Sequence, residues 1–433
     1  MKKKNKIFLP MMVALILVSG ISSVLASPTD IKLTVWKPSW GIDEKYLVPI
    51  FKKFEKSNPG VRIEYLFHPW EGLMERYTTA FMAGHPPDLF YLPDVHYPKL
   101  AASGLLAKLD EFFPQDIVKV KKEYMQRWWN SAIYKGHVYG IPYVHVGITL
   151  AYNKDLFDEG GIEYPAPMDD PKFSEWTWNK FVEVAQKLTI PEKDQWGYAW
   201  AANWAGDAEV WMYCYIWQAG AEIINEEGTG VGFDNKAGLT AFKFMNDLVN
   251  TYRVVPDGGM NPKFHDYFYT GHAAIAPFDC YQVTAMVKDY PELNIGITPY
   301  AQGPGRNLLD GRGMHANVGF WLMSNRCDYK DIAYKLMKFL TSKEYCEEYI
   351  NAAGLFGCRK DYEMKIDNPK AQELGKIILA AAERYGHAYP INPHQIEVNP
   401  VFYAEVQNMV QQLKTPEQAW KDAVNRINEI LKR

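Results

Sequence analysis

Cysteine is scarce in this 433-residue chain: there are five cysteines, and none are spaced as C-x-x-C. The sequence therefore predicts no structural zinc site, and we expect neither a metal nor a cofactor. The odd number leaves at least one thiol unpaired. Whether one or two disulfides form among the others stays open, and the five are Cys214, Cys280, Cys327, Cys346 and Cys358.

An excess of basic residues is also lacking, since 47 Lys and Arg face 51 Asp and Glu and the formal charge is −4. Phosphate backbones are bound through a basic surface, so nucleic acid is excluded as the main partner. The chain has no internal repeat and no GxSxG, P-loop, HExxH or dinucleotide motif. No local pattern therefore indicates an enzyme class.

Apolar and aromatic residues are abundant, at 48% and 15% of the chain. A chain of this length and composition buries large cores, and two lobes are expected rather than one. The aromatic residues comprise 14 Trp, 28 Tyr and 21 Phe.

The first 26 residues have the pattern of a cleavable signal peptide. Lysines within Lys2–Lys6 precede an apolar run over Ile7–Val18, and Val24 and Ala26 fit the −3 and −1 positions of a cleavage site. A membrane anchor is the alternative, but the run is short for a span. We expect export to the periplasm or the extracellular space with a mature start near Ser27. No cysteine lies there for a lipid anchor.

Strand and helix patterns alternate along the chain and predict an α/β protein with mainly parallel sheets. Strands are expected over 31–36, 61–67 and 89–92, with amphipathic helices between them. Further on, a helix opened by Ser174 is expected over 173–188. Near the end, Thr415–Gln418 has the pattern of a capping box with Pro416 at the first helical position.

The order of four passages resembles family 1 of the extracellular solute-binding proteins of ABC importers, which includes maltose-binding protein. The resemblance runs from about residue 31 to the C-terminus. The passages are Phe54–Ile63; Ala83–Tyr91 with Ala102–Leu106; Tyr139–Pro142 with Leu150–Phe157; and Phe268–Ala274 with Gly319–Ser324.

The resemblance implies a two-lobed periplasmic-binding-protein fold of type II, with strands that cross between the lobes. It implies a monomer that traps a carbohydrate, such as an oligosaccharide, by hinge closure and delivers it to an ABC permease. The expected divisions are a signal peptide at 1–26, the N-lobe at 27–146 and 319–385, and the C-lobe at 147–318 and 386–433. A third crossing is placed near Tyr385.

Ligands of open α/β sheets bind beyond the carboxyl ends of the strands. Aromatic rings can pack the C–H face of a sugar, while carboxylates, imidazoles and indole N–H groups bond its hydroxyls. The candidates at such positions are Trp36, Trp40, Trp70, Tyr91, Asp94, Trp204, Asp207, Trp211, Phe278, Asp279, Tyr281 and His315. Phe402 joins them through the resemblance alone.

The sequence also departs from the pattern of maltose-binding protein at several positions, so maltose itself is not predicted. Tyr91 and Asp94 fall on sugar-contacting positions. The departures are Val95 for an expected Arg, Trp40 for an acid, Phe402 for a stacking Trp, and Val146, beside His145, for a hinge-side acid.

Structural roles compete with these binding roles. Trp36 and Trp211 can equally belong to a core, and Asp94 and Asp279 can cap the helices that follow them. Arg359–Asp361 is interpreted as a structural ion pair.

Three other functions remain open from the sequence. An exported glycoside hydrolase would use Asp94 and Asp279 as its two carboxylates. An importer subunit for glycerol phosphate, a polyamine or a peptide, and a cell-wall lectin, are the others.

Overall fold

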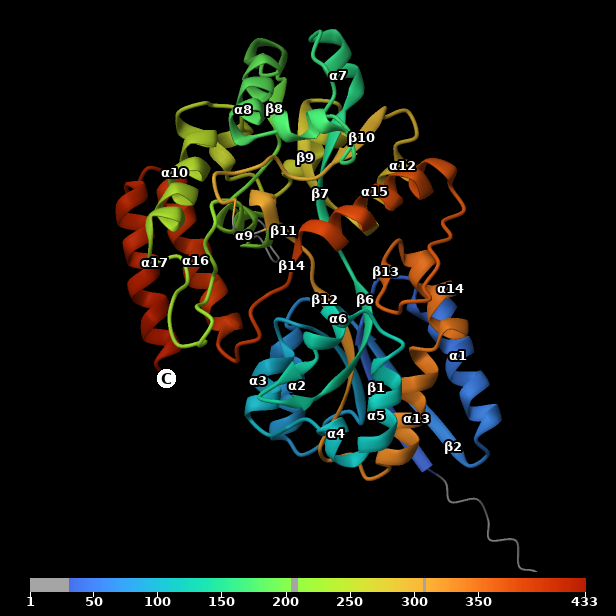
Figure 1. Ribbon diagram of the computed structural model, residues 1–433. Helices are drawn as coiled ribbons and strands as arrows, with labels where there is room; N and C mark the ends of the chain where they lie inside the picture. Colours follow the sequence, from blue (N-terminus) through green and yellow to red (C-terminus); the bar gives the residue numbers. More distant parts are fainter. Residues whose placement is uncertain (1–30, 204–208, 307–308) are drawn as a thin grey trace, which may run out of the picture.

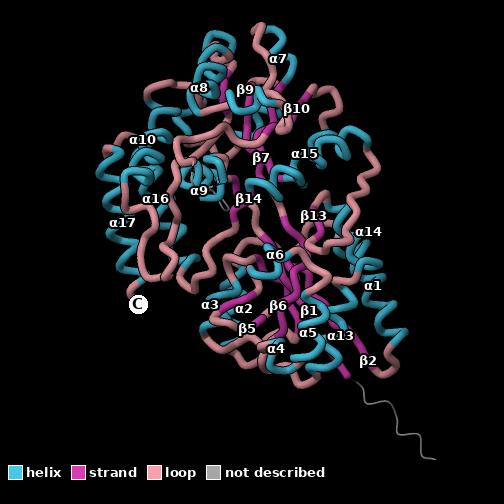
Figure 2. Tube along the Cα trace, in the orientation of Figure 1, coloured by secondary structure: helices cyan, strands magenta, loops and turns pink. Residues whose placement is uncertain are grey.

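The computed structural model describes residues 31–203, 209–306 and 309–433. The predicted signal peptide and two candidate ligand residues, Trp204 and Asp207, lie outside these residues. Figure 1 shows two lobes joined by crossing segments, and Figure 2 shows the strands at the centre of each lobe with helices around them. Within the described residues, no helix is both long and apolar enough to cross a membrane.

The N-lobe is built on a six-stranded sheet of order β13-β6-β12-β3-β1-β2. Alternation explains β1, where Leu33 and Val35 are fully buried and Lys32 is exposed. The strands are β1 (Ile31–Pro38), β2 (Val61–His68), β3 (Leu89–Pro93), β6 (Gly140–His145), β12 (Val318–Met323) and β13 (Phe356–Gly357).

Eight helices surround this sheet in the lower lobe of Figure 1, and β4 (Ile133–Tyr134) and β5 (His137–Val138) form a short hairpin beside it. The helices are α1 (Asp43–Ser57), α2 (Leu73–Met82), α3 (Tyr97–Ala102), α4 (Leu109–Phe112), α5 (Pro114–Lys121), α6 (Gln126–Asn130), α13 (Lys330–Leu340) and α14 (Lys343–Ala353).

The C-lobe contains a four-stranded sheet of order β10-β7-β9-β8, and β11 pairs with β14 nearby. Its strands are β7 (Ile148–Asn153), β8 (Trp196–Tyr198), β9 (Ala273–Asp279), β10 (Ile295–Thr298), β11 (Met314–His315) and β14 (Gly386–His387). Its helices are α7 (Lys154–Glu159), α8 (Trp178–Lys187), α9 (Glu209–Gln218), α10 (Lys236–Asn250), α11 (Phe264–Tyr269), α12 (Cys280–Asp289), α15 (Pro369–Tyr385), α16 (Gln395–Val410) and α17 (Pro416–Leu431).

Both sheets are mixed, so the prediction of mainly parallel sheets is wrong. In the N-lobe, β1 is parallel to β2 and β3, whereas β12 runs antiparallel to β3 and β6. In the C-lobe, β7 is antiparallel to β9 and β10. The crossings between the lobes explain the antiparallel pairing of β6 and β12. The chain leaves the N-lobe through β6 toward β7, and it returns from β11 through β12 in the opposite direction.

The predicted lobe boundary at residue 385 also needs correction. Helix α15 packs against α12, β10 and β7 of the C-lobe rather than against the N-lobe sheet. In Figure 1 it lies in the upper lobe. The chain therefore returns to the C-lobe between β13 and Pro369, ahead of the expected crossing near Tyr385. Helix periodicity is the same in either lobe, so the local pattern could not assign this helix.

Helix starts were predicted with mixed success. The capping box at Thr415 is confirmed, since its Oγ1 accepts the Gln418 N–H at 3.2 Å and its own N–H donates to Gln418 Oε1 at 3.1 Å. The helix expected over 173–188 is split, and α8 begins after Thr177, whose Oγ1 accepts from Lys180 N. Trp176 leaves the helical conformation there (φ −73°, ψ 80°).

All five cysteines, each within the described residues, are buried and unbridged.

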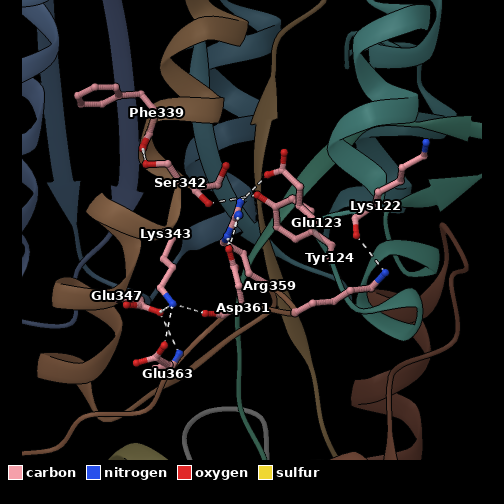
Figure 3. A network of polar contacts seen from close by, with 12 residues as sticks. Lys122, Glu123, Tyr124, Phe339, Ser342, Lys343, Glu347, Arg359, Asp361 and Glu363 are labelled. Atoms are coloured by element: carbon pink, nitrogen blue, oxygen red, sulfur yellow. Dashed lines mark hydrogen bonds and ion pairs between the residues drawn. The ribbon is translucent and has the colours of Figure 1, made fainter.

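The Arg359–Asp361 passage contains a structural ion pair, as predicted, and the pair is part of a larger network of polar contacts (Figure 3). Arg359 donates to both carboxylate oxygens of Asp361, at 2.7 and 3.0 Å, and to Glu123 Oε2 at 2.7 Å. Its side chain is 12% exposed. Nearby, Lys343 Nζ donates to Glu363 Oε1 at 3.0 Å. The network ties the segment after β13 to the segment before α6.

We expect Arg359→Met to lower the free energy of unfolding by about 1–3 kcal/mol, because three charge-assisted hydrogen bonds are lost. Lys343→Met is the matched control, since Lys343 is more exposed and an exposed pair contributes less than about 1 kcal/mol. Urea unfolding of both variants measures the difference. Equal losses in the two variants would contradict the assignment of Arg359 as the centre of the network.

Candidate functional site

A cavity of about 800 Å³ lies between the lobes. The N-lobe contributes residues from the segment after β1, from α2, and from the end of β3. The C-lobe contributes the ends of β9 and β11, and helices α9 and α16. The lining residues are Ser39, Trp40, Trp70, Glu71, Leu73, Met74, Tyr91, Pro93, His96, Val144, Val146, Ile148, Val210, Asp279, Tyr281, His315, Asn317 and Ile396.

Three aromatic residues form the N-lobe side of the cavity, and we call Trp40, Trp70 and Tyr91 the aromatic wall. The ring centroids of Trp40 and Trp70 are 5.5 Å apart, and Tyr91 meets Trp40 edge-on at 5.4 Å. Trp70 Nε1 donates to Ser39 O at 3.1 Å. Both Trp rings are half-buried, so the wall is held on one side and exposed to the cavity on the other.

A buried ion pair supports the aromatic wall from behind. Lys37 and Asp43 are 0% and 1% exposed, and Lys37 Nζ lies 2.6 Å from Asp43 Oδ1. The same ammonium lies 3.9 Å from the centroid of the Trp40 ring. Asp43 also accepts from Trp40 N at 2.7 Å and from Tyr349 OH at 2.8 Å. The pair therefore fixes the backbone and the ring of Trp40.

Burial and electrostatic attraction have opposite effects on the pKa values of Lys37 and Asp43. Burial lowers the pKa of Lys37 to about 8, although the charge of Asp43 and its hydrogen bond act in the other direction. For Asp43, burial alone would raise the pKa, but Lys37 and the hydrogen bonds from Tyr349 and Trp40 outweigh it and the pKa is lowered. Both groups are charged at neutral pH.

Polar side chains face the aromatic wall from the C-lobe. Asp279 ends β9 and begins α12, where its N–H donates to Gln282 Oε1 at 2.9 Å in a capping box. It therefore caps a helix and lines the cavity at once. His315 is 1% exposed, and neither of its ring nitrogens has a hydrogen-bond partner among the described residues. Burial lowers its pKa to about 3, so the neutral ring offers one donor and one acceptor.

Asp94 follows the lining residue Pro93 in the chain but is not itself among the lining residues. It is 1% exposed, and both carboxylate oxygens are buried without a hydrogen-bond partner among the described residues. Burial raises its pKa to about 8, against weaker opposing effects of backbone N–H groups. The cap expected of Asp94 is not formed, since His96 holds the N-cap position of α3.

The predicted site residues thus fall into two groups. Trp40, Trp70, Tyr91, Asp279, Tyr281 and His315 line the cavity. Trp36, Asp94, Trp211, Phe278 and Phe402 do not line it, and Trp204 and Asp207 lie outside the described residues. Trp36 packs on Tyr77, Trp211 on Phe264 and Phe278 on His265. Phe402 is fully buried against Tyr213 in the C-lobe, at 4.7 Å between ring centroids.

Several lining residues were not predicted from the sequence. Ser39 and Glu71 adjoin the predicted tryptophans, and Asn317 lies at the crossing into β12, so their positions after strands were a usable signal. The aliphatic members gave none, because a valine or isoleucine in a strand is typical of a core. Within the described residues, no three His, Cys, Asp or Glu side chains gather as metal ligands.

Comparisons with known proteins identify the family. The family described as bacterial extracellular solute-binding protein matches residues 38–345. A putative binding protein of Brucella abortus is 24% identical over 96% of this chain and 98% of its own. A maltotriose-binding protein of Pyrococcus abyssi is 25% identical over 65% of this chain and 56% of its own.

Solved structures share the fold. An ABC substrate-binding protein of Listeria monocytogenes in complex with cycloalternan superposes with a TM-score of 0.78 at 21% identity, over 92% of this chain and 98% of that one. Maltose-bound MalE3 of T. maritima gives a TM-score of 0.73 at 23% identity, over 92% and 100% of the two chains. The expected two-lobed type II fold is confirmed.

Proposed function

The chain belongs to the bacterial extracellular solute-binding protein family, and we propose that it is the exported binding protein of an ABC importer for a neutral carbohydrate. It captures a saccharide of oligosaccharide size between its lobes and delivers it to a membrane permease. The saccharides named for its relatives and structural neighbours support this ligand class.

One observation carries the proposal: the cavity brings an aromatic wall together with polar groups of the opposite lobe. Trp40 and Trp70 can pack the C–H faces of sugar rings, and Asp279 and His315 can bond the hydroxyls. No lysine or arginine is among the described residues lining the cavity. These lining groups suit a neutral ligand better than a phosphate or a carboxylate, because an anionic ligand is typically bound by arginine or lysine.

Closure of the lobes is the proposed working step. Lys99 of α3 pairs with Glu397 of α16 at 3.0 Å, and Arg127 of α6 donates to the Ala382 carbonyl of α15 at 2.7 Å. These contacts join the N-lobe to the C-lobe. A ligand that touches both lobes shifts the protein toward this arrangement, and a permease can distinguish it from the open one.

Binding without catalysis is part of the proposal. The hydrolase alternative requires Asp94 and Asp279 to act on one bond, yet Asp279 lines the cavity and Asp94, which is buried, does not. Incubation with labelled glycans, followed by product analysis, tests this point. Shortened products would favour the hydrolase.

A thermal-shift screen with neutral oligosaccharides, phosphorylated sugars, polyamines and peptides tests the ligand class. A ligand at one hundred times its Kd stabilises the folded state by about 2.7 kcal/mol. We expect stabilisation by members of the neutral glycan set. A flat response to all glycans together with a response to polyamines or peptides would overturn the proposal.

Trp70→Ala is expected to weaken binding of the saccharide found in that screen by about 30-fold, as for an interface residue worth about 2 kcal/mol. Trp196→Ala is the matched control, since Trp196 is also half-buried but lies on β8 and does not line the cavity. Isothermal titration measures both affinities, and thermal unfolding verifies that both variants are folded. Equal affinities in the two variants would contradict the role of the aromatic wall.

A further inference from the structure

Helix α14 of the N-lobe and helix α12 of the C-lobe meet at Gly354, on the right-hand side of the molecule in Figure 1. Gly354 ends α14 in the left-handed backbone region, with a φ of +67°. A methyl group built on Gly354 would lie 2.6 Å from Thr284 Oγ1 and 2.8 Å from Thr284 Cβ, in the middle of α12. The two lobes therefore approach each other here to a distance that only glycine allows.

Rotation of the Thr284 side chain does not relieve this crowding. The Cβ atom is bonded to the backbone of α12, so it keeps its position in every rotamer. The hydroxyl is also held, because Thr284 Oγ1 donates to Cys280 O at 3.2 Å. Helix α14 packs on α1 and α13 of the N-lobe, whereas α12 packs on α15 and β9 of the C-lobe. Room for a larger residue at Gly354 therefore requires the lobes to separate.

Helix α12 connects this contact to the cavity. Its N-cap residue Asp279 and its second residue Tyr281 both line the cavity. Thr284 follows Tyr281 by three positions, and residues three positions apart lie on the same side of a helix. A ligand that binds at Asp279 or Tyr281 therefore acts on the helix that carries the contact.

Helix α14 connects the same contact to the aromatic wall. Tyr349 of α14 donates to Asp43 at 2.8 Å, and the centroids of the Tyr349 and Trp40 rings are 6.2 Å apart. Gly354 lies five positions after Tyr349, at the end of the same helix. The two helices that meet at Gly354 thus support the cavity from opposite lobes.

We propose that Gly354 is a positioning residue for closure: because it lacks a side chain, α14 and α12 can meet when the lobes close on a saccharide. Neither Gly354 nor Thr284 is among the lining residues, so this contact sets the affinity from outside the cavity. The inference rests on the proposed function and adds a determinant of its affinity. A larger residue would hold the lobes apart, and the measured affinity falls with the fraction of the protein that can still close.

Gly354→Ala is expected to weaken saccharide binding about tenfold, a loss in the range of overfilling a closely packed contact. Gly271→Ala is the matched control. Gly271 also follows a helix at positive φ (+76°), but a methyl group there meets no described atom within 4 Å apart from its chain neighbours. Both variants place alanine in the left-handed region, so thermal unfolding should show similar losses of stability in the free proteins.

Isothermal titration measures the affinities. The titrant is the saccharide that stabilises the wild type most in the thermal-shift screen, which includes maltotriose, cycloalternan and N,N′-diacetylchitobiose. Stopped-flow tryptophan fluorescence, with Trp40 and Trp70 as natural reporters, measures release. We expect the loss in Gly354→Ala to appear as faster dissociation, because the open form still meets the saccharide at the same rate.

A second substitution in the opposite lobe separates the contact from strain within α14. Thr284→Gly removes the Cβ atom that the alanine methyl group would meet, whereas Thr284→Ala would keep it. The double variant Gly354→Ala/Thr284→Gly should therefore bind within about threefold of Thr284→Gly alone. Should Gly354→Ala fail to fold, Thr284→Leu crowds the same contact from α12 and is expected to weaken binding in the same way.

The outcomes separate this inference from the proposed function. Equal affinities of Gly354→Ala and Gly271→Ala, or an unchanged affinity in a folded Thr284→Leu protein, would overturn the inference while carbohydrate binding stands. A loss that Thr284→Gly does not relieve would also overturn it, because the methyl group would then act within α14 alone. If the wild type binds no saccharide of the screen, the proposed function falls and the inference falls with it.

Discussion

Replacement of Lys37 by methionine is expected to lower the free energy of unfolding by about 3–5 kcal/mol, the range typical of breaking a buried ion pair from one side. Asp43 would then stay buried with its charge uncompensated, because both side chains are at most 1% exposed. Lys52→Met is the matched control. Lys52 also pairs with an acid, Glu55, but its side chain is 63% exposed, so a loss below about 1 kcal/mol is expected.

The pH dependence of this loss identifies its cause. The lowered pKa of Asp43 stabilises the folded state above the ordinary pKa of about 3.9, and this stabilisation is lost as the pH falls through the folded-state pKa. Without Lys37, Asp43 can be buried as a neutral acid once the pH is low enough. Urea unfolding at pH 7 and pH 4 should therefore show a smaller difference between the variant and the wild type at pH 4.

The double variant Lys37→Met/Asp43→Asn should recover part of the loss, since no buried charge remains. A Lys37→Met protein as stable as the wild type at pH 7 would contradict the structural role of the pair. The same variants report on the aromatic wall, because Lys37 contacts the ring of Trp40 and Asp43 accepts its backbone N–H. A weaker saccharide affinity in the folded double variant is expected.

Asp94→Asn is expected to stabilise the protein, and to do so most strongly at alkaline pH. The pKa of Asp94 is raised from 3.8 to about 8 by burial, so folding disfavours the charged form that the unfolded chain adopts above pH 4. The stabilising contribution of Asp94 to the folded wild-type protein is fully present below about pH 4 and declines as the pH rises to about 8. Since one pKa unit is worth about 1.4 kcal/mol and the pKa rises from 3.8 to about 8, the decline is at most about 6 kcal/mol.

Asparagine carries no such charge, so the gain from Asp94→Asn should grow from pH 4 to pH 8 and then stay constant. Asp116→Asn is the matched control: Asp116 pairs with Lys338 at the surface and its pKa is lowered, so the same substitution should cost a little stability at neutral pH. Thermal unfolding across this pH range measures both. A gain at Asp94 that is independent of pH would contradict the raised pKa.

A buried carboxyl group that lowers the stability of the folded state indicates a functional role, because such a loss of stability is typical of binding and catalytic residues. Asp94 adjoins Pro93 and His96 of the cavity lining, and we expect Asp94→Asn to weaken saccharide binding while it stabilises the free protein. Affinity that is unchanged in this variant would restrict Asp94 to a structural role.

The sequence by itself determined much of the local structure and a third of the residues that line the cavity, six of eighteen. Alternation of apolar residues predicted the strand at 31–36, a short continuous apolar run predicted the strand at 89–92, and the pattern at Thr415–Gln418 predicted the start of the last helix. The rule that ligands lie beyond strand ends found the aromatic wall and Asp279, Tyr281 and His315. These features can be predicted from the sequence because each depends on residues that are only a few positions apart in the chain.

Tertiary structure decided what depends on distant segments. Tyr349 reaches Asp43 across 306 positions of the chain, and no local pattern indicates such a contact. The lobe to which α15 belongs, the place of Phe402 in a core, and the turning of Val144, Val146 and Ile148 toward a cavity follow from packing between elements. The pKa of Asp94 is set in the same way, because desolvation is a property of the surrounding fold and not of the residue.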